Sequence, residues 1–245
     1  MATSEGFGEL TGRIGNHIYY KVGSELRIRK MPTKDFSKKV KQGKSFENFR
    51  EFGTLLAKSS CIGKLIRDSL MDSKADFFDQ DTHHRLNALI QEATKLDDEP
   101  IVKKKRLLPG NAGLLAGFQF RKSADISSYF SDVAMTEING EKVLKVGFVN
   151  DKATQKFPYA QLSVLILALD PAKLRGSIIG KNTQMYDLMS VKEGFAVPIA
   201  NVSLEADVIY LVLLQVEPYT TINGLLLRMY EKSYQCLKVI DVMYV

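Results

Sequence analysis

The apolar residues of this chain change their spacing near residue 107, and that change limits the possible folds more than any other feature. Before this point they recur every three or four residues, which is typical of amphipathic helices. After it they alternate with polar residues, which is typical of half-buried strands. Prolines at 100 and 109 mark the transition. The sequence therefore predicts an α+β chain with two domains, a hairpin and helices over 1–106 and an antiparallel β-sandwich over 107–245.

The first strands are predicted within residues 12–32. Ile18, Tyr19 and Tyr20 favour a strand, and the segment 22–25 contains a glycine that suits a tight turn. In the returning strand, Leu26 and Ile28 alternate with Arg27 and Arg29, so one face is apolar and the other basic. A two-stranded hairpin alone is marginal in water. We therefore expect this hairpin to dock on another surface, through Tyr19, Tyr20, Leu26, Arg27, Ile28 and Arg29.

The rest of the first domain is expected to be a connector and two helices. Residues 33–44 are polar and basic without a period, which indicates a flexible connector. Ser45 can cap a helix that continues to about Met71. A second helix is expected from Asp81 or Thr82 up to Pro100.

Beyond residue 107 the sequence predicts many short strands. Asn139-Gly140 is the strongest hairpin signal, because both residues tolerate the positive φ of a type I′ turn. The runs 162–169 and 208–216 do not alternate cleanly, so we expect them at the centre of a sheet, covered on both faces. The expected strands are 133–138, 141–149, 162–169, 196–203, 208–216, 225–231 and 235–245, with a further alternation at Phe118 and Phe120.

Charge is concentrated near the start of the chain. Residues 21–67 hold 13 Lys and Arg against 4 Asp and Glu, whereas residues 68–99 hold 3 against 9. Two interpretations remain open. The two segments can neutralise each other, within one molecule or between copies, or the basic segment can bind nucleic acid phosphates. The lysines that would contact phosphates are Lys30, Lys34, Lys38, Lys39, Lys41 and Lys44.

The sequence offers no arrangement of residues that supports catalysis. The histidines are His17, His83 and His84, and neighbours on a helix point about 100° apart, so the last two are expected to be solvated and not to share a metal. Cys61 and Cys236 are expected to be reduced and packed. Asp79, Asp81 and the run 97–99 are expected to be solvated carboxylates. We therefore expect no enzyme activity, no metal, no cofactor and no small-molecule substrate.

The first residues and the apolar runs of the sequence bear on targeting. The N-terminus lacks the basic and apolar regions of a secretory signal, and no apolar run is long enough to span a membrane. We therefore expect synthesis in the cytoplasm and no membrane-spanning segment. An assembled particle is the final location that we consider.

One set of residues carries a family resemblance. The pattern Gly12-x-x-Gly15-Asn16, then Tyr19-Tyr20-Lys21, Gly23 and Arg29-x-x-Pro32, resembles the opening of a family of uncharacterised Bacteroidetes proteins. The segments 48–52 and 115–120 also approximate elements of that family, and the resemblance covers mainly residues 12–70. It implies an N-terminal element joined to an immunoglobulin-like β region, and a surface, mobile-element or phage-related assembly protein. It implies no activity.

These observations leave two functional hypotheses. The first is a non-enzymatic structural protein that self-associates through its hairpin and β-sandwich, as a homo-oligomer or larger assembly. The second is a nucleic-acid-associated protein that binds phosphates through the basic segment 21–67.

Overall fold

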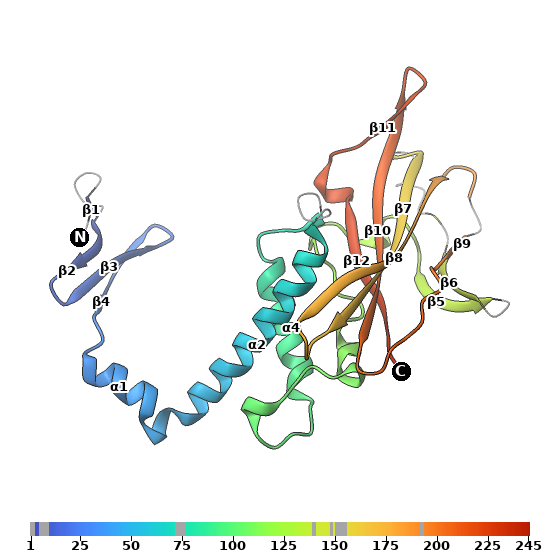
Figure 1. The fold of residues 1–245 in the computed structure, drawn as a ribbon. Helices are drawn as coiled ribbons and strands as arrows, with labels where there is room; N and C mark the ends of the chain where they lie inside the picture. Colours follow the sequence, from blue (N-terminus) through green and yellow to red (C-terminus); the bar gives the residue numbers. More distant parts are fainter. Residues whose placement is uncertain are drawn as a thin grey trace. The chain divides into compact units, whose positions relative to one another are not determined.

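The computed structural model shows an α+β chain in which every strand pairing is antiparallel. The chain divides into two compact units, residues 1–52 (unit 1) and residues 53–245 (unit 2). Figure 1 shows the elements of each unit. The structure describes residues 3, 4, 10–71, 77–138, 141–147, 149, 156–191 and 194–245.

Unit 1 begins with a small sheet in which each strand pairs with the next along the chain. Gly15 (φ 56°) and Gly23 (φ 62°) lie in its two tight turns, where the left-handed backbone favours glycine. The expected hairpin is confirmed as β3 and β4, and two further described strands precede it. The strands are β1 (Thr3–Ser4), β2 (Leu10–Ile14), β3 (His17–Val22) and β4 (Glu25–Lys30).

The segment expected to be a flexible connector is instead largely the helix α1 (Lys34–Gln42). The Thr33 hydroxyl caps it by accepting a hydrogen bond from the Phe36 backbone N–H at 3.2 Å. Asp35 lies in the first turn and two lysines lie in the last turn, as the helix dipole favours. Local capping and charge placement therefore form a helix without an apolar period.

The two longer helices are confirmed close to their expected bounds. A 3₁₀ turn, η1 (Lys44–Phe46), precedes helix α2 (Glu47–Ser69), so α2 begins two residues after the expected cap. Helix α4 (Thr82–Lys95) begins at the expected threonine. Five residues after the end of α4 comes Pro100, which cannot continue a helix.

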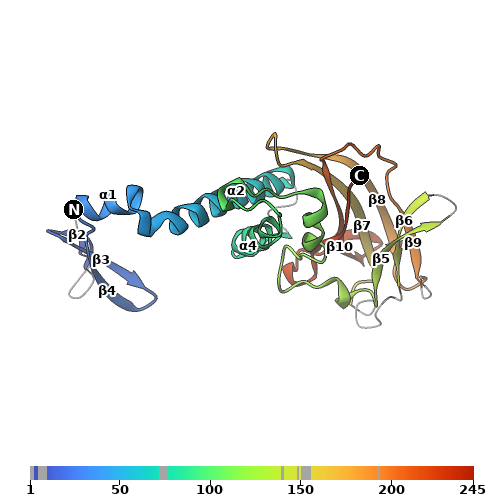
Figure 2. The ribbon, with the colours of Figure 1, turned by 90° about the horizontal axis from the view of Figure 1, so that it is seen from below.

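Unit 2 is built on a five-stranded sheet with the order β11-β10-β7-β8, in which β12 also pairs with β10. In Figures 1 and 2, α4 and the part of α2 in unit 2 lie on one side of this sheet, and three short strands lie on the other. The five strands are β7 (Tyr159–Asp170), β8 (Arg175–Asp187), β10 (Ile209–Ile222), β11 (Leu225–Arg228) and β12 (Cys236–Met243).

A second sheet of three strands has the order β5-β6-β9. Ile138 pairs with Glu141 across the β5–β6 hairpin, and the Asn139-Gly140 turn itself lies outside the described residues. The strand expected over 196–203 extends only to Pro198, which has no N–H for a ladder. The strands are β5 (Val133–Ile138), β6 (Glu141–Val146) and β9 (Phe195–Pro198). Four 3₁₀ turns join elements of unit 2, namely η2 (Val102–Lys104), η3 (Pro109–Leu115), η4 (Ile126–Ser128) and η5 (Lys232–Tyr234).

Two hydrophobic cores lie on opposite faces of the five-stranded sheet. Along β7, Leu165 and Leu167 face the core formed with the helices, whereas Val164 and Ile166 face the core formed with the small sheet. Strand β10 alternates in the same way. The expectation that these two strands are central and covered on both faces is confirmed, and burial on both faces explains why they do not alternate in sequence.

The boundary expected at residue 106 does not coincide with the division between units. Ile62, Ile66, Leu86 and Ile90 of α2 and α4 are buried in the same core as the sheet residues of β7 and β10. The helices therefore complete the core of the C-terminal sheet. The change of period in the sequence marks a change of secondary structure inside one unit.

Candidate docking surfaces

None of the described residues from 11 to 52 is buried. Strand β4 is exposed along its whole length, and α1 buries no residue. Large apolar side chains are exposed instead, and Ile28 (57%) and Phe49 (66%) are the most exposed of them. The others are Ile14, Tyr20, Val22, Leu26, Phe36 and Phe52. Unit 1 therefore has the strands and helices of a folded element, but its residues 11–52 form no buried core of their own.

The strand register decides which docking residues share a face. Tyr19 lies opposite Ile28, and Lys21 lies opposite Leu26. Tyr20 lies opposite Arg27 on the other face. The expected separation into an apolar and a basic face thus holds along β4, but the side chains of β3 mix both faces of the sheet.

The basic face is organised by short contacts within the sheet. The Arg29 guanidinium lies 5.6 Å from the centre of the Tyr20 ring, a cation–π distance. Arg27 pairs with Glu25 at 3.1 Å, with both side chains more than half exposed. Exposed pairs of this kind contribute little to stability. The arginines are therefore available to a partner at small cost to the sheet.

The outer edge of β4 is open. Among the described strands, β4 pairs only with β3, so one row of its backbone N–H and C=O groups has no strand partner. An open edge is a template for pairing with another strand. The docking residues expected from the sequence thus lie on or beside a free sheet edge.

The lysines expected to contact phosphates lie mainly on α1. Lys34, Lys38 and Lys41 follow one stripe of the helix, and with Pro32 they line a shallow hollow of about 300 Å³. Lys38 and Lys39 line another of about 400 Å³. Lys30 ends β4, Lys44 begins η1, and both are exposed. The structure thus gathers most of these lysines on one short helix.

The join between α1 and α2 is held by specific contacts. Arg50 donates from one guanidinium nitrogen to the Val40 and Gly43 carbonyls, both at 2.9 Å. The Phe36 and Phe46 rings meet edge to face, with centroids 5.9 Å apart. These contacts fix the direction of α1 relative to the start of α2 within unit 1.

The acidic segment 68–99 offers less free charge than its sequence indicates. Asp79 accepts from Arg85 at 2.9 Å and from the Lys122 N–H at 2.9 Å. Burial alone would raise the pKa of Asp79, but the hydrogen bonds from Lys122, Thr82 and Arg85 lower it to about 2. The expectation that Asp79 is a solvated carboxylate is wrong, because it clasps the start of α4 to the segment after Phe120.

Asp97 is also engaged within the chain. It accepts from the backbone N–H groups of Arg106 at 2.8 Å and Glu99 at 3.1 Å. The bond from Arg106 leads the effects that lower the pKa of Asp97. Asp81 is exposed, as expected. The two engaged carboxylates bind their own chain, which weakens the case for this segment as the acidic docking surface.

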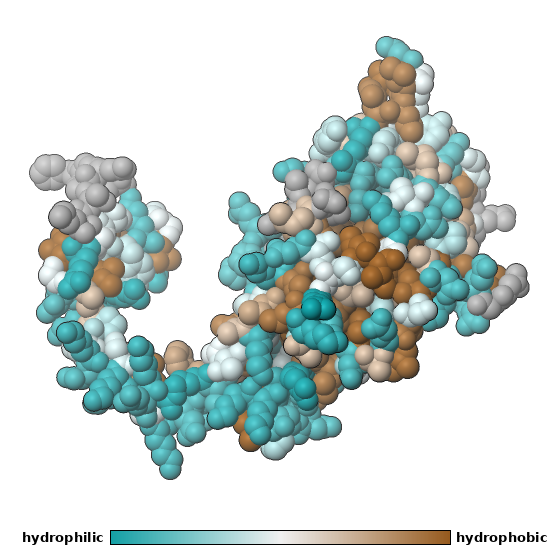
Figure 3. All heavy atoms as spheres, viewed as in Figure 1, coloured by the Kyte–Doolittle hydropathy of each residue, from teal (hydrophilic) through white to brown (hydrophobic). Residues whose placement is uncertain are grey.

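A second exposed apolar surface was not expected from the sequence. Strands β10 and β11 extend as a hairpin, here called the finger (residues 217–231), whose turn residues Asn223 (φ 51°) and Gly224 (φ 77°) form the left-handed pair of a type I′ turn. Figure 3 shows hydrophobic side chains at its end. The exposed side chains are Ile222 (52%), Leu225 (66%), Leu226 (44%), Leu227 (43%) and Tyr230 (73%). The Asn-Gly pair was the sequence signal that could have identified this hairpin.

The charged side chains at the base of the finger form ion pairs. Arg228 contacts Glu217 at 2.9 Å, with the carboxylate side chain only 10% exposed. Lys156 contacts Glu231 at 3.1 Å. These ion pairs leave the finger an apolar surface with compensated charge.

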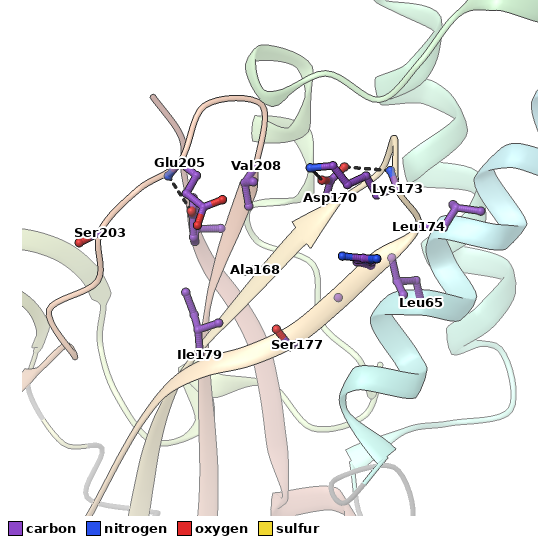
Figure 4. Close-up of a pocket in the computed structure, with 13 residues that line it drawn as sticks. Leu65, Ala168, Asp170, Lys173, Leu174, Ser177, Ile179, Ser203, Glu205 and Val208 are labelled. Atoms are coloured by element: carbon purple, nitrogen blue, oxygen red, sulfur yellow. Dashed lines mark hydrogen bonds and ion pairs between the residues drawn. The ribbon is translucent and has the colours of Figure 1, made fainter.

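A hollow in unit 2 has a volume of about 660 Å³ and lies beside the β7–β8 turn. Figure 4 shows Asp170, Lys173, Leu174, Ile179 and Glu205 around it, with Leu65 of α2 at one side. Asp170 pairs with Lys173 at 2.8 Å, and hydrogen bonds from Lys173 lower the pKa of Asp170. The hollow is open and lined by both charges. It contains no nucleophile paired with a base.

The candidate catalytic residues are placed as structural or surface groups. His83 and His84 are exposed, as expected, and their rings lie 3.8 Å apart. Cys61 is exposed, which corrects the expectation that it is packed. Cys236 is buried, and burial raises the pKa of its thiol to about 12. The buried Tyr129 hydroxyl donates to the Tyr234 carbonyl at 2.6 Å, and burial raises its pKa.

No group of three or more His, Cys, Asp or Glu residues among the described positions is arranged to hold a metal ion. No helix in that part of the chain is long and apolar enough to cross a membrane. Comparisons with protein-family models, with curated proteins and with solved structures find no match to this chain.

Proposed function

We propose that this protein is a non-enzymatic structural protein that self-associates through unit 1. The observation that carries the proposal is that no described residue from 11 to 52 is buried, although the segment forms a sheet and helices. Exposed apolar surface that is contiguous marks an interaction site. A partner that covers this surface would supply the core that unit 1 lacks.

The remaining features fit this role. Unit 2 has two cores and would form the body of the assembly. We further propose that its two sheets form an immunoglobulin-like sandwich. The family resemblance of residues 12–70 favours a setting in a surface or phage-related particle. The protein would be made in the cytoplasm and act as a homo-oligomer or larger assembly, without cofactor or small-molecule substrate.

The first test removes the docking element. Deletion of residues 1–32 is expected to abolish assembly, because it removes the open strand edge and the exposed apolar residues of β3 and β4. Light scattering measures the mass, and circular dichroism confirms that unit 2 keeps its β signal. Assembly of the deletion variant like that of the full chain would contradict the proposal.

A second test separates apolar from charged contributions. Leu26→Asp is expected to weaken assembly about tenfold or more at any salt concentration, because it places a charge in a buried contact. Arg27→Glu with Arg29→Glu is expected to weaken it more at low salt than at high salt, since exposed charges are screened. Sedimentation at two ionic strengths measures both. Identical salt dependence of the two variants would show that the two side-chain classes do not act as proposed.

The alternative is nucleic acid binding, which the lysine stripe of α1 favours. Lys34, Lys38 and Lys41 could contact successive phosphates, and the affinity would then fall log-linearly with salt concentration. Replacement of these three by Gln should reduce the slope of that dependence without altering assembly. Absorbance at 260 nm of the purified protein provides the simplest check.

A further inference from the structure

We propose that the finger of one copy is the surface on which the β4 edge of the next copy docks. This inference rests on the proposed function and deepens it, because it names the acceptor. The proposal joins two exposed apolar strand edges, β4 in unit 1 and β11 in unit 2, in a contact between copies.

The finger has the properties of an acceptor strand. Among the described strands, β11 pairs only with β10, so its outer edge is open. The register places Leu225 and Leu227 on one face and Leu226 on the other, so both faces beside the edge are apolar. A strand added at this edge would gain main-chain hydrogen bonds and apolar cover on both sides.

The long edge of β8 is a poorer acceptor. Its pairing with β7 shifts at Ile179, which forms a β-bulge between Ile178 and Gly180. From Lys181 to Gln184 its residues are polar or charged. Bulges and charged residues are the features with which proteins protect sheet edges. The three leucines of β11 include neither a bulge nor a charged residue. An apolar edge without such protection is a site of association.

The charges of the two surfaces favour docking of unit 1 on a finger over docking of unit 1 on another unit 1. Residues 10–52 hold 11 Lys and Arg against 4 Asp and Glu, a net charge of +7. Two copies of unit 1 docked on each other would therefore repel. The finger holds Arg228 against Glu217 and Glu231, with Lys156 at its base, so it carries no net positive charge that would repel the basic unit. The Glu231 side chain is 47% exposed and is the carboxylate that the arginines of β4 would face. Pairing of two fingers would leave unit 1 uncovered.

The contact is consequently heterologous, with different surfaces on the two copies. After the first contact, the copy that docked through unit 1 keeps a free finger, and the copy that accepted it keeps a free unit 1. Such contacts repeat until they close into a ring or continue as a filament. The structure thus favours a repeating assembly over an isolated dimer.

Cross-linking of single-cysteine variants tests this arrangement in the full chain. In a Cys61→Ser background, one variant carries Ile28→Cys in β4 and a second carries Leu226→Cys in the finger, while the buried Cys236 is retained. A short bismaleimide is expected to give a cross-linked dimer in a mixture of the two variants and to lose that product with either variant alone. Met189→Cys, 62% exposed, is the control for random collision when mixed with the Ile28→Cys variant.

The other outcomes overturn the inference in distinguishable ways. Cross-linking of the Leu226→Cys variant alone would show finger-to-finger pairing, and cross-linking of the Ile28→Cys variant alone would show pairing of two first units. An assembled chain that gives no product in the mixture refutes the acceptor but leaves the proposed function. A chain that light scattering shows to be a monomer refutes both.

Discussion

Both units of this protein consist largely of regular helices and strands, but the two units differ in how much of that structure is buried. In unit 2, the apolar residues of β7 and β10 are divided between two cores, and the helices and the small sheet cover both faces. In unit 1, the same kinds of strand and helix leave every described residue from 11 onward at least partly accessible. The difference teaches that a regular backbone is not a folded domain, because stability comes mainly from buried apolar surface.

Separating the two units should give the largest effect. A fragment of residues 53–245 is expected to unfold cooperatively like the full chain, because both cores lie within it. A fragment of residues 107–245 should fail to fold, because it lacks the α2 and α4 side chains that cover Leu165 and Leu211. Chemical denaturation followed by circular dichroism measures both. A cooperative transition in the shorter fragment would restore the boundary expected from the sequence.

A matched pair of phenylalanines compares the units directly. Phe120 is fully buried in unit 2, where it stacks on Phe78, whereas Phe49 in unit 1 is 66% exposed. Phe120→Ala is expected to lower the free energy of unfolding by about 3 to 5 kcal/mol. Phe49→Ala should change it by about 0.5 kcal/mol or less. Urea denaturation under non-associating conditions measures these values, and a comparable loss from both would mean that unit 1 has a core.

The contacts of Asp79 should make the stability of unit 2 depend on pH. The pKa of Asp79 is about 2 in the folded state, below the ordinary value of 3.8, so the ionised carboxylate stabilises the folded state. This stabilisation is present above pH 4 and is lost as the pH falls toward 2. After allowance for solvent screening, this contribution is about 1 to 2 kcal/mol. Asp79→Asn should therefore flatten the acid side of the stability profile, whereas Asp81→Asn, at an exposed carboxylate, should leave it unchanged. Urea titrations from pH 2 to pH 6 measure the profile.

Two glycines provide the smallest test. A Cβ at Gly53 in α2 would meet no atom within 4 Å, so Gly53→Ala should stabilise the protein by about 0.5 to 1 kcal/mol through helix propensity. A Cβ at Gly176 in β8 would lie 2.8 Å from the Ser69 hydroxyl and 3.1 Å from Leu65 and Leu169. Gly176→Ala should therefore destabilise by about 1 to 3 kcal/mol. Opposite signs in thermal denaturation would support the packing of α2 on β8, and equal signs would contradict it.

Sequence reasoning identified the strands with strong local signals. The first hairpin, both long helices and the central strands β7 and β10 follow from glycine turns and apolar periodicity. Strand β8 was not expected, because RGSIIGKNTQMYD mixes glycines with polar residues and packs mainly through its pairing with β7. The strand expected over 225–231 is β11, but its hairpin with β10 was not expected, although the Asn223-Gly224 turn lies between two apolar runs.

The sequence by itself determined which residues of an element share a face, because the periods of helices and strands are local properties of the backbone. Only the tertiary structure decided what covers each face. It placed the helices of the expected first domain on the C-terminal sheet, and it left Leu26, Ile28 and the leucines of the finger uncovered. Burial depends on contacts between residues that are distant in sequence. A local pattern of apolar residues does not identify the distant segment that packs on a given face.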